Sequence, residues 1–217
     1  DLFHDAALDT GGAFADSSVA EIDALSGGAA SAEVSAQKHV VFYAEKIKAD
    51  GSVNGEKVEL LSYDNKVSPQ ESLIVLKKAL DEGARIVFQG NGSAVAHAIT
   101  DAVLKYNERN PGKEVLYFNY AAIDPALTNE KCHFWHFRFD ADVDMKMGAH
   151  TDTIARDPRI KKVYLMNQDY AFGKAVAAAA GSMLAARRTD IQMVGNARRA
   201  RQKRREAART LATITAA

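Results

Sequence analysis

The chain has 217 residues, with 28 basic and 28 acidic side chains, 47% hydrophobic residues and a single cysteine. This length accommodates one domain or two small ones, and the balanced charge argues against a nucleic-acid-binding or membrane-surface protein. The lone Cys132 excludes an internal disulfide and a cysteine-rich metal site. No apolar run approaches the ~20 residues of a membrane-spanning helix, and the first residues have neither the basic start nor the apolar core of a signal peptide.

Strand-like and helix-like patterns alternate along most of the chain. Short apolar or alternating runs predict strands at 19–25, 57–63, 86–88, 114–120, 133–139, 162–166 and 191–194. Apolar residues at helical spacing predict helices at 34–47, 69–82, 93–106, 142–155 and 174–184. Such alternation predicts an α/β fold built on parallel sheets, with two lobes in succession.

Local signals sharpen several of these elements. Ser68, Pro69 and Glu71 have the spacing of a capping box that begins a helix. Asn54-Gly55 has the strongest two-residue hairpin signal in the chain. The inward-facing helix positions are predicted to be Val40, Val41, Ala44 and Ile47, then Leu73, Leu76 and Leu80, then Val95, Ala98, Ile99, Ala102, Val103 and Tyr106.

The segment 84–106 carries the clearest candidate for a functional site. An apolar run at 86–88 leads into the glycine turn 90–93, which leads into a helix. In a parallel sheet this turn lies at the carboxyl end of its strand, where ligands bind. Ser93 is expected at or beside the helix N-cap, so that its hydroxyl and the first free backbone N–H groups face the crevice and can hold an anion such as a carboxylate. The alternative is that Ser93 only caps its helix.

The composition changes at Asn196. The segment 196–217 contains seven Lys or Arg residues and one acidic residue, Glu206. Such a segment could contact the phosphates of nucleic acid through a salt-sensitive attraction, which makes an interaction protein the second functional class. No aromatic residues are interleaved for base stacking, so a solvated tail is the simpler interpretation.

Several motifs follow one another in a distinctive order along 18–195. They are Leu25-Ser26-Gly27, Ile47-Lys48-Ala49-Asp50-Gly51, Val53-Asn54-Gly55, Tyr63-Asp64-Asn65, Ser68-Pro69-Gln70, Gly90-Asn91-Gly92-Ser93, the run 119–128 and Asp169-Tyr170-Ala171-Phe172-Gly173. In this order they resemble the periplasmic type I solute-binding proteins. The resemblance is strongest to the branched-chain amino acid group of ABC-transporter substrate-binding proteins, which also takes up aromatic carboxylates.

The resemblance implies a non-enzymatic, periplasmic protein whose two Rossmann-like lobes close on a small carboxylate or amino acid and deliver it to the membrane permease of an ABC transporter. It implies neither cofactor nor metal. The loop serine and nearby backbone groups would hold the carboxylate or amine, and an aromatic ring of the second lobe would cover the apolar part. The ligand-binding residues predicted in this way are Gly92, Ser93, Ala121, Ala122, Ile123, Tyr170 and Phe172. Ile123 stands where family members often have Thr or Ser.

The resemblance also predicts the domain organisation. We expect a disordered extension at 1–17, a first lobe at 18–140, the start of a second lobe at 141–195 and a basic tail at 196–217. Because members of the group are much longer, we expect a truncated or frame-shifted product with exposed apolar strand edges and helix faces. Such a product would bind ligand weakly at best, or not at all, and would tend to associate.

Other functional patterns fit less well. Gly90-x-Gly92 suggests a dinucleotide fingerprint, but Val95 occupies the sixth position, where Gly or Ala is needed. His133 and His136 are expected on opposite faces of a strand, where they cannot easily share a metal ion. No G-x-S-x-G nucleophile elbow is present.

Overall fold

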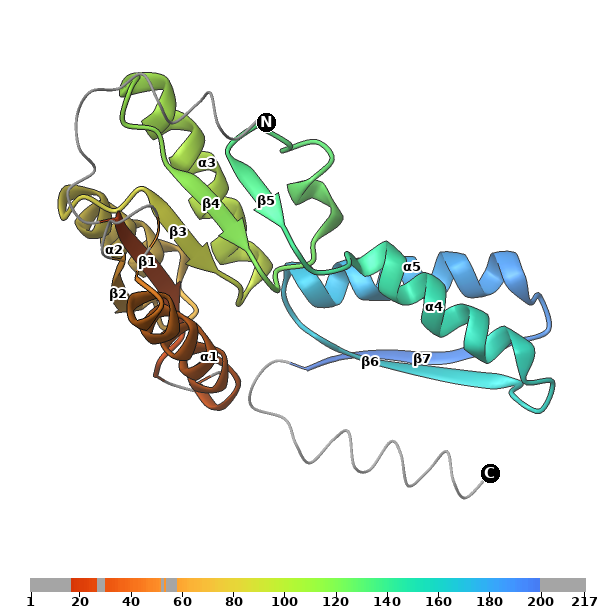
Figure 1. The fold of residues 1–217 in the computed structure, drawn as a ribbon. Coiled ribbons are helices and arrows are strands. Elements are labelled where there is room, and N and C mark those ends of the chain that lie inside the picture. Colours follow the sequence, from red (N-terminus) through yellow and green to blue (C-terminus); the bar gives the residue numbers. More distant parts are fainter. Residues whose placement is uncertain (1–16, 27–29, 52, 54–57, 200–217) are drawn as a thin grey trace, which may run out of the picture. The chain divides into compact units, whose positions relative to one another are not determined.

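A computed structural model of the chain describes residues 17–26, 30–51, 53 and 58–199 (Figure 1). The chain divides into two compact units: unit 1 comprises Asp1–Ala122 and Ala126–Asp140, and unit 2 comprises Ile123–Pro125 and Ala141–Ala217. The hairpin signal at Asn54-Gly55, nearly all of the predicted extension 1–17 and residues 200–217 of the predicted tail lie outside the described residues.

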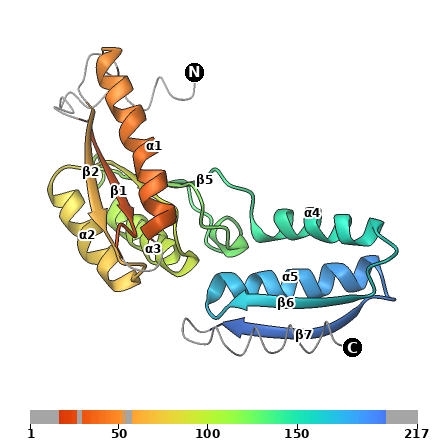
Figure 2. The same cartoon turned by 90° about the horizontal axis from the view of Figure 1, so that it is seen from below.

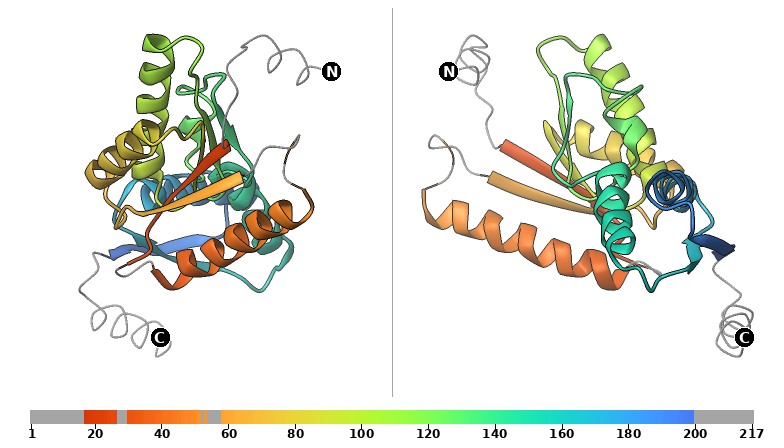
Figure 3. Two further views of the ribbon diagram at one scale, coloured as in Figure 1. Left: turned by 60° about the vertical axis from the view of Figure 1, so that its left-hand side comes forward. Right: turned by 90° about the vertical axis from the view of Figure 1, so that its right-hand side faces the viewer.

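Unit 1 is built on a five-stranded parallel sheet in the order β2-β1-β3-β4-β5. Its helices α2 and α3 lie side by side on one face of the sheet, and α1 lies along β2 on the other (Figure 3). The α/β fold with parallel strands that the sequence predicts is therefore confirmed. The strands are β1 (Ser17–Asp23), β2 (Val58–Asp64), β3 (Ile86–Gln89), β4 (Leu116–Asn119) and β5 (His136–Arg138), and the helices are α1 (Ala30–Ala49), α2 (Pro69–Asp81) and α3 (Ser93–Arg109).

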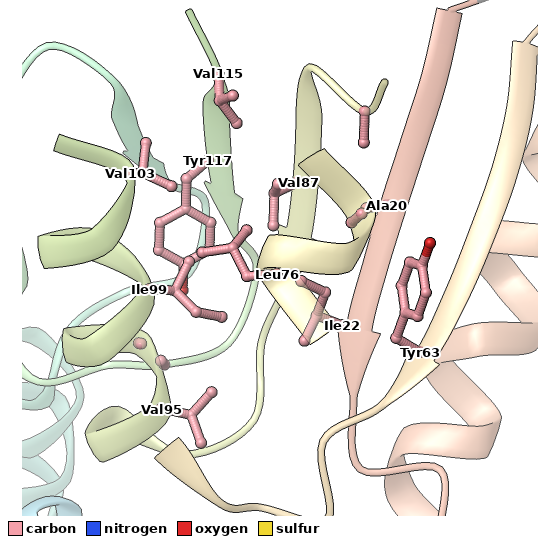
Figure 4. Close-up of a cluster of buried hydrophobic side chains, with 14 of the residues drawn as sticks. Ala20, Ile22, Tyr63, Leu76, Val87, Val95, Ile99, Val103, Val115 and Tyr117 are labelled. Atoms are coloured by element: carbon pink, nitrogen blue, oxygen red, sulfur yellow. The ribbon is translucent and has the colours of Figure 1, made fainter. Parts of the chain in front are cut away.

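The core of unit 1 lies between the sheet and helices α2 and α3 (Figure 4). Strand register places Ala20 beside Val87 and Val87 beside Tyr117, so these side chains share one face of the sheet. Leu76 of α2 and Ile99 of α3 pack against that face. Burying a side chain of the size of Leu or Ile contributes about 1.5–3 kcal/mol, so this layer fixes the positions of β1, β3 and β4.

Helix α2 begins where the sequence predicts, but its cap and its buried face differ from the prediction. Ser68 is the N-cap and its hydroxyl accepts a hydrogen bond from the Glu71 N–H at 3.2 Å. The Ser68 N–H donates to the Asn65 carbonyl at 2.8 Å instead of to the Glu71 carboxylate, so only half of the capping box forms. Leu73 is 42% exposed, because the sheet covers the stripe formed by Ser72, Leu76 and Ala79.

The predicted buried faces of the other two helices in unit 1 are correct to different extents. In α3 the core positions Val95, Ile99 and Val103 are buried as predicted. In α1 only Ala44 of the predicted face is buried, and Val41 and Ile47 are exposed together with neighbouring aromatic residues. Helical spacing shows which residues share a face, but it does not show whether another element covers that face.

The described residues of unit 2 form two helices and a two-stranded parallel sheet (Figure 2). Its elements are α4 (Val143–Arg156), β6 (Lys162–Gln168), α5 (Ala171–Arg187) and β7 (Gln192–Arg199). Asp142 caps α4 as predicted, with its carboxylate accepting from the Met145 N–H at 2.8 Å. Strand β7 was expected to end at Val194 but continues to Arg199, because its backbone pairs with β6 as far as Gln168. The first residues of the predicted basic tail therefore belong to a strand.

The segment 133–139 was predicted to be one strand, but only His136–Arg138 forms β5. A turn precedes it, closed by a hydrogen bond from the His136 N–H to the His133 carbonyl at 3.3 Å. The alternation argument that placed His133 and His136 on opposite faces is therefore wrong, and their ring centroids lie 6.2 Å apart. In the described part of the chain, no group of three or more His, Cys, Asp or Glu side chains could hold a metal ion.

Candidate ligand-binding site

Three neighbouring strands of unit 1 each end in a fully buried polar residue. Asp23 ends β1, Gln89 ends β3 and Asn119 ends β4, and all three have an exposed fraction of 0%. Because β1, β3 and β4 are parallel and adjacent, these side chains lie at one edge of the sheet. Buried polar groups are retained where they have hydrogen-bond partners, and here the partners belong to the loops that follow the strands.

The carboxylate of Asp23 holds the loop that follows β3. Its Oδ1 accepts hydrogen bonds from the N–H groups of Asn91 at 3.1 Å and Gly90 at 3.4 Å. The phenol of Tyr120, in the loop after β4, donates to Asp23 Oδ2. Gly90 is required at its position, because a Cβ atom there would clash with the ring of Tyr120.

Gln89 also holds this loop, through the backbone carbonyl of Asn91. Its Nε2 donates to the backbone carbonyl of Asn91, and its Oε1 accepts from the Tyr117 hydroxyl at 2.5 Å. Burial, and secondly the charge of Asp23, raise the pKa of Tyr117 well above its ordinary value. Tyr117 therefore remains a neutral hydrogen-bond donor at any physiological pH.

Ser93 is the first residue of α3, beside the N-cap Gly92, as the sequence predicts. Gly92 has φ 85°, a backbone conformation that glycine adopts readily. The first intrahelical hydrogen bond runs from the Ala96 N–H to the Gly92 carbonyl at 2.9 Å, so the N–H groups of residues 93–95 have no acceptor within the helix.

The alternative in which the Ser93 hydroxyl only caps α3 is wrong, because no side-chain capping hydrogen bond exists at this helix. Ser93 is 2% exposed, and its Oγ makes no hydrogen bond to another residue that the structure describes. A hydroxyl that has no partner in the protein can donate to a bound ligand. Together with the free N–H groups of the first turn, it forms a donor set suited to a carboxylate.

The backbone N–H groups of Ala121 and Ala122 are already engaged. They donate to Asn119 Oδ1 at 3.2 and 2.7 Å, and the Ala122 carbonyl accepts from Asn119 Nδ2 at 2.8 Å. Among the described residues nothing donates to the Ala121 carbonyl, so an acceptor rather than a donor is available in this loop. An ammonium group needs an acceptor of this kind.

The remaining predicted site residues belong to unit 2. Ile123 is buried in a small apolar cluster with Val143 and Ala179, against which Phe172 packs. Tyr170 and Phe172 lie at the start of α5 with ring centroids 5.8 Å apart, and both are half-buried. Burial raises the pKa of Tyr170. The structure thus groups Gly92, Ser93, Ala121 and Ala122 in unit 1 and groups Ile123, Tyr170 and Phe172 in unit 2.

Sequence reasoning missed Asp23, Gln89, Asn119 and Tyr120 as residues that shape the site. One signal could have found two of them: Gln89 and Asn119 are each the last, polar residue of a short apolar strand that precedes a loop. None of the helices in the described residues is long and apolar enough to cross a membrane.

A parallel doubly wound sheet with a donor-rich loop at its carboxyl edge defines a ligand-binding α/β protein, and comparison with known proteins agrees. Residues 18–208 match the sequence profile described as periplasmic binding protein. The chain therefore belongs to the periplasmic binding protein family, which consists of solute-binding proteins rather than enzymes.

Individual relatives place the chain in the branched-chain amino acid group of type I periplasmic binding proteins. It is 40% identical over 160 residues to the Leu/Ile/Val-binding protein homolog 4 of Brucella abortus, an alignment that covers 71% of this chain and 38% of the relative. A leucine-, isoleucine-, valine-, threonine- and alanine-binding protein from Brucella ovis, solved in a closed conformation, has 34% identity and a TM-score of 0.75. That match covers 92% of this chain and 51% of the solved chain.

More distant structures share the fold alone. A solute-binding protein from R. palustris, solved in complex with benzoate, has a TM-score of 0.80 at 16% identity and matches 92% of this chain and 53% of its own. The chain thus spans between about two fifths and about half of the length of these relatives.

Proposed function

We propose that the chain acts as the substrate-binding component of an ABC transporter and captures a hydrophobic amino acid or a small aromatic carboxylate in the periplasm. The observation that carries this proposal is the Ser93 hydroxyl, which has no described partner and lies at the N-terminus of α3. Support for the ligand class comes from the Brucella relatives named for aliphatic amino acids and from the benzoate complex of the R. palustris protein.

The carboxylate of the ligand accepts hydrogen bonds from Ser93 Oγ and from the N–H groups that follow it in α3. Each hydrogen bond to a charged group contributes about 1.5–3 kcal/mol, and the helix dipole adds to the attraction. An amino acid ligand additionally donates from its ammonium group to the Ala121 carbonyl. No covalent bond forms or breaks, so selectivity depends on these contacts and on the fit of the side chain.

The apolar part of the ligand contacts residues of unit 2 in this proposal. Tyr170 and Phe172 provide aromatic surface, and Ile123 provides an aliphatic contact where a hydroxyl residue would donate a hydrogen bond. Capture occurs by a hinge motion that closes the two lobes on the ligand, and the loaded protein then engages the permease.

Thermal unfolding with and without ligand tests the proposal. The panel consists of leucine, valine, phenylalanine, 4-hydroxycinnamate and benzoate, each at a concentration well above the expected Kd. A ligand present at ~100 times its Kd adds about 2.7 kcal/mol of stability, which is a clear shift of the midpoint. A shift with any of these ligands identifies the substrate class, whereas a cooperative transition that ignores the whole panel contradicts the proposal.

Ser93→Ala separates a ligand contact from a structural role. Because the hydroxyl has no described partner, its removal should leave the unfolding midpoint nearly unchanged, while affinity for the active ligand falls by roughly tenfold or more. Ser68→Ala is the matched control: it removes the hydroxyl that caps α2, which costs about 1 kcal/mol of stability, and it should leave affinity unchanged. Equal affinities of Ser93→Ala and the unsubstituted chain would exclude Ser93 as a ligand contact.

A further inference from the structure

The carboxylate of Asp23 connects the two loops that carry the predicted ligand contacts of unit 1. Through Oδ1 it accepts from the N–H groups of Gly90 and Asn91. These two residues directly precede Gly92, the N-cap of α3, which Ser93 follows. Through Oδ2 it accepts from the hydroxyl of Tyr120, the residue that precedes Ala121. One fully buried side chain on β1 is therefore bonded to the loop after β3 and to the loop after β4.

The surrounding contacts leave these loops little freedom. The Asn91 carbonyl is held by Gln89 Nε2, so the peptide groups on both sides of Asn91 are fixed by buried side chains. The Tyr120 N–H donates to the Gln89 carbonyl at 3.2 Å, which ties the second loop to β3 as well. The ring of Tyr120 lies directly against Gly90, so the two loops are packed together as well as hydrogen-bonded.

We propose that Asp23 and Tyr120 are positioning residues of the carboxylate-binding site: they do not contact the ligand, but they fix the loop 90–92 so that Ser93 and the first N–H groups of α3 are pre-oriented. This inference rests on the proposed function. Asp23 already accepts from the N–H groups of Gly90 and Asn91. The backbone N–H groups of residues 93–95 are therefore the ones that can donate to an anion. A binding site that is ordered before its ligand arrives loses less conformational entropy on binding, which appears as higher affinity.

Tyr120→Phe is the most direct test, because it keeps the ring that packs on Gly90 and removes only the hydroxyl that donates to Asp23. Tyr63→Phe is the matched control. The Tyr63 hydroxyl also donates to a carboxylate of unit 1, Glu82 Oε2 at 2.5 Å, but that carboxylate belongs to the C-cap of α2 and not to the loops that follow β3 and β4. Asp23→Asn is the second variant, in which a neutral and weaker acceptor replaces the carboxylate for both N–H groups.

The first measurement is amide hydrogen exchange of the full chain without ligand. We expect exchange at Gly90 and Asn91 to accelerate by roughly tenfold in Tyr120→Phe, and by more in Asp23→Asn, relative to the unsubstituted chain. In Tyr63→Phe these two amides should exchange at the original rate. If Tyr120→Phe and Asp23→Asn leave exchange at these amides unchanged, the inference is overturned whether or not any ligand binds.

The second measurement is the affinity of the same variants for the ligand that stabilises the unsubstituted chain. We expect affinity to fall by about three- to tenfold in Tyr120→Phe and to stay unchanged in Tyr63→Phe. Faster loop exchange with unchanged affinity would overturn the positioning role while leaving the proposed function intact. Failure of the unsubstituted chain to bind any member of the panel would contradict the proposed function, and the exchange data would then decide by themselves whether the pair orders the loop.

Discussion

At the scale of single residues, His136 shows how burial sets a protonation state. Its ring stacks on Tyr117 with centroids 4.9 Å apart, and its Nδ1 lies 3.2 Å from the Leu127 carbonyl. Within the described structure its Nε2 is buried without a hydrogen-bond partner. Burial lowers the pKa of His136 to about 4, opposed only by the hydrogen bond to Leu127. The imidazole is therefore neutral in the folded protein over the whole physiological range.

This depressed pKa predicts acid sensitivity of the fold. A histidine with a pKa of about 4 in the folded state and about 6.5 unfolded binds more protons when the chain unfolds. Its contribution is fully present above about pH 6.5 and is lost as the pH falls toward 4, by up to ~3 kcal/mol. His133, whose pKa is also lowered by burial, acts in the same direction.

Urea unfolding at several pH values between 7.5 and 4.5 measures this effect. His136→Phe keeps a stacking ring on Tyr117 and cannot be protonated, so the loss of stability on acidification should be smaller than in the unsubstituted chain. His39→Gln, at an exposed position on α1, serves as the control and should preserve the original pH dependence. Parallel curves for His136→Phe and the unsubstituted chain would contradict the assignment.

Residue-level prediction from the sequence succeeded where the determinants are local. Ser93 could be placed at the start of α3 because the glycine turn and the helical spacing are adjacent in the chain. Asp23 could not be recognised, since Glu21 and Asp23 made β1 look like a poor strand, yet both are fully buried. The donors that accommodate Asp23 come from a loop 67 and 68 residues further along the chain, where no local pattern connects them to β1.

At the scale of secondary-structure elements, Arg188 links the two helix-to-strand connections of unit 2, α4 to β6 and α5 to β7. It lies directly after α5, and its guanidinium donates to carbonyl groups in the last turn of α4 and in the segment after it: Ala155 at 3.4 Å, Asp157 at 3.0 Å and Ile160 at 3.2 Å. It also forms a two-pronged ion pair with Asp190 at 2.7 Å through Nε and Nη2. A planar guanidinium can serve all these acceptors together, whereas a lysine ammonium cannot.

Replacing this arginine should therefore destabilise unit 2. We expect Arg188→Ala to lower the free energy of unfolding of unit 2 clearly, and Arg188→Lys to recover only part of that loss. The neighbouring Arg187 pairs with Asp152 nearer the surface, so Arg187→Ala should cost no more than ~1 kcal/mol. Urea unfolding of the three variants makes the comparison. Equal losses for Arg187→Ala and Arg188→Ala would show that the carbonyl contacts contribute little.

At this scale the sequence predicted well which elements exist and in what order. It predicted less well which face of each helix is buried. The caps Ser68 and Asp142 were found because capping depends on residues three apart in the chain. The prediction that Val41 and Leu73 are buried was wrong, because the periodicity of a helix does not show which elements pack against it. The continuation of β7 to Arg199 was missed because pairing with β6 is a property of the backbone, which a basic side-chain composition does not prevent.

At the scale of the whole molecule, the two units have cores of very different size. In the described residues, the core cluster of unit 1 contains fifteen buried hydrophobic residues, and that of unit 2 contains three. The sheet that the structure describes in unit 2 has two strands, with exposed methionines on both. Local stability follows buried apolar contact, so the free energy needed to open unit 2 should be the smaller of the two.

Native-state hydrogen exchange at increasing urea concentration tests this difference. Amides of β6 and β7 should exchange through openings of lower free energy than amides of β3 and β4, because less apolar surface is exposed when unit 2 opens. A saturating ligand adds a second criterion: if Tyr170 and Phe172 contact it as proposed, exchange should slow in α5 as well as at the start of α3. Slowing confined to unit 1 would mean that unit 1 binds the carboxylate without unit 2. Identical opening energies in the absence of ligand would show that the units unfold as one cooperative structure despite the small core of unit 2.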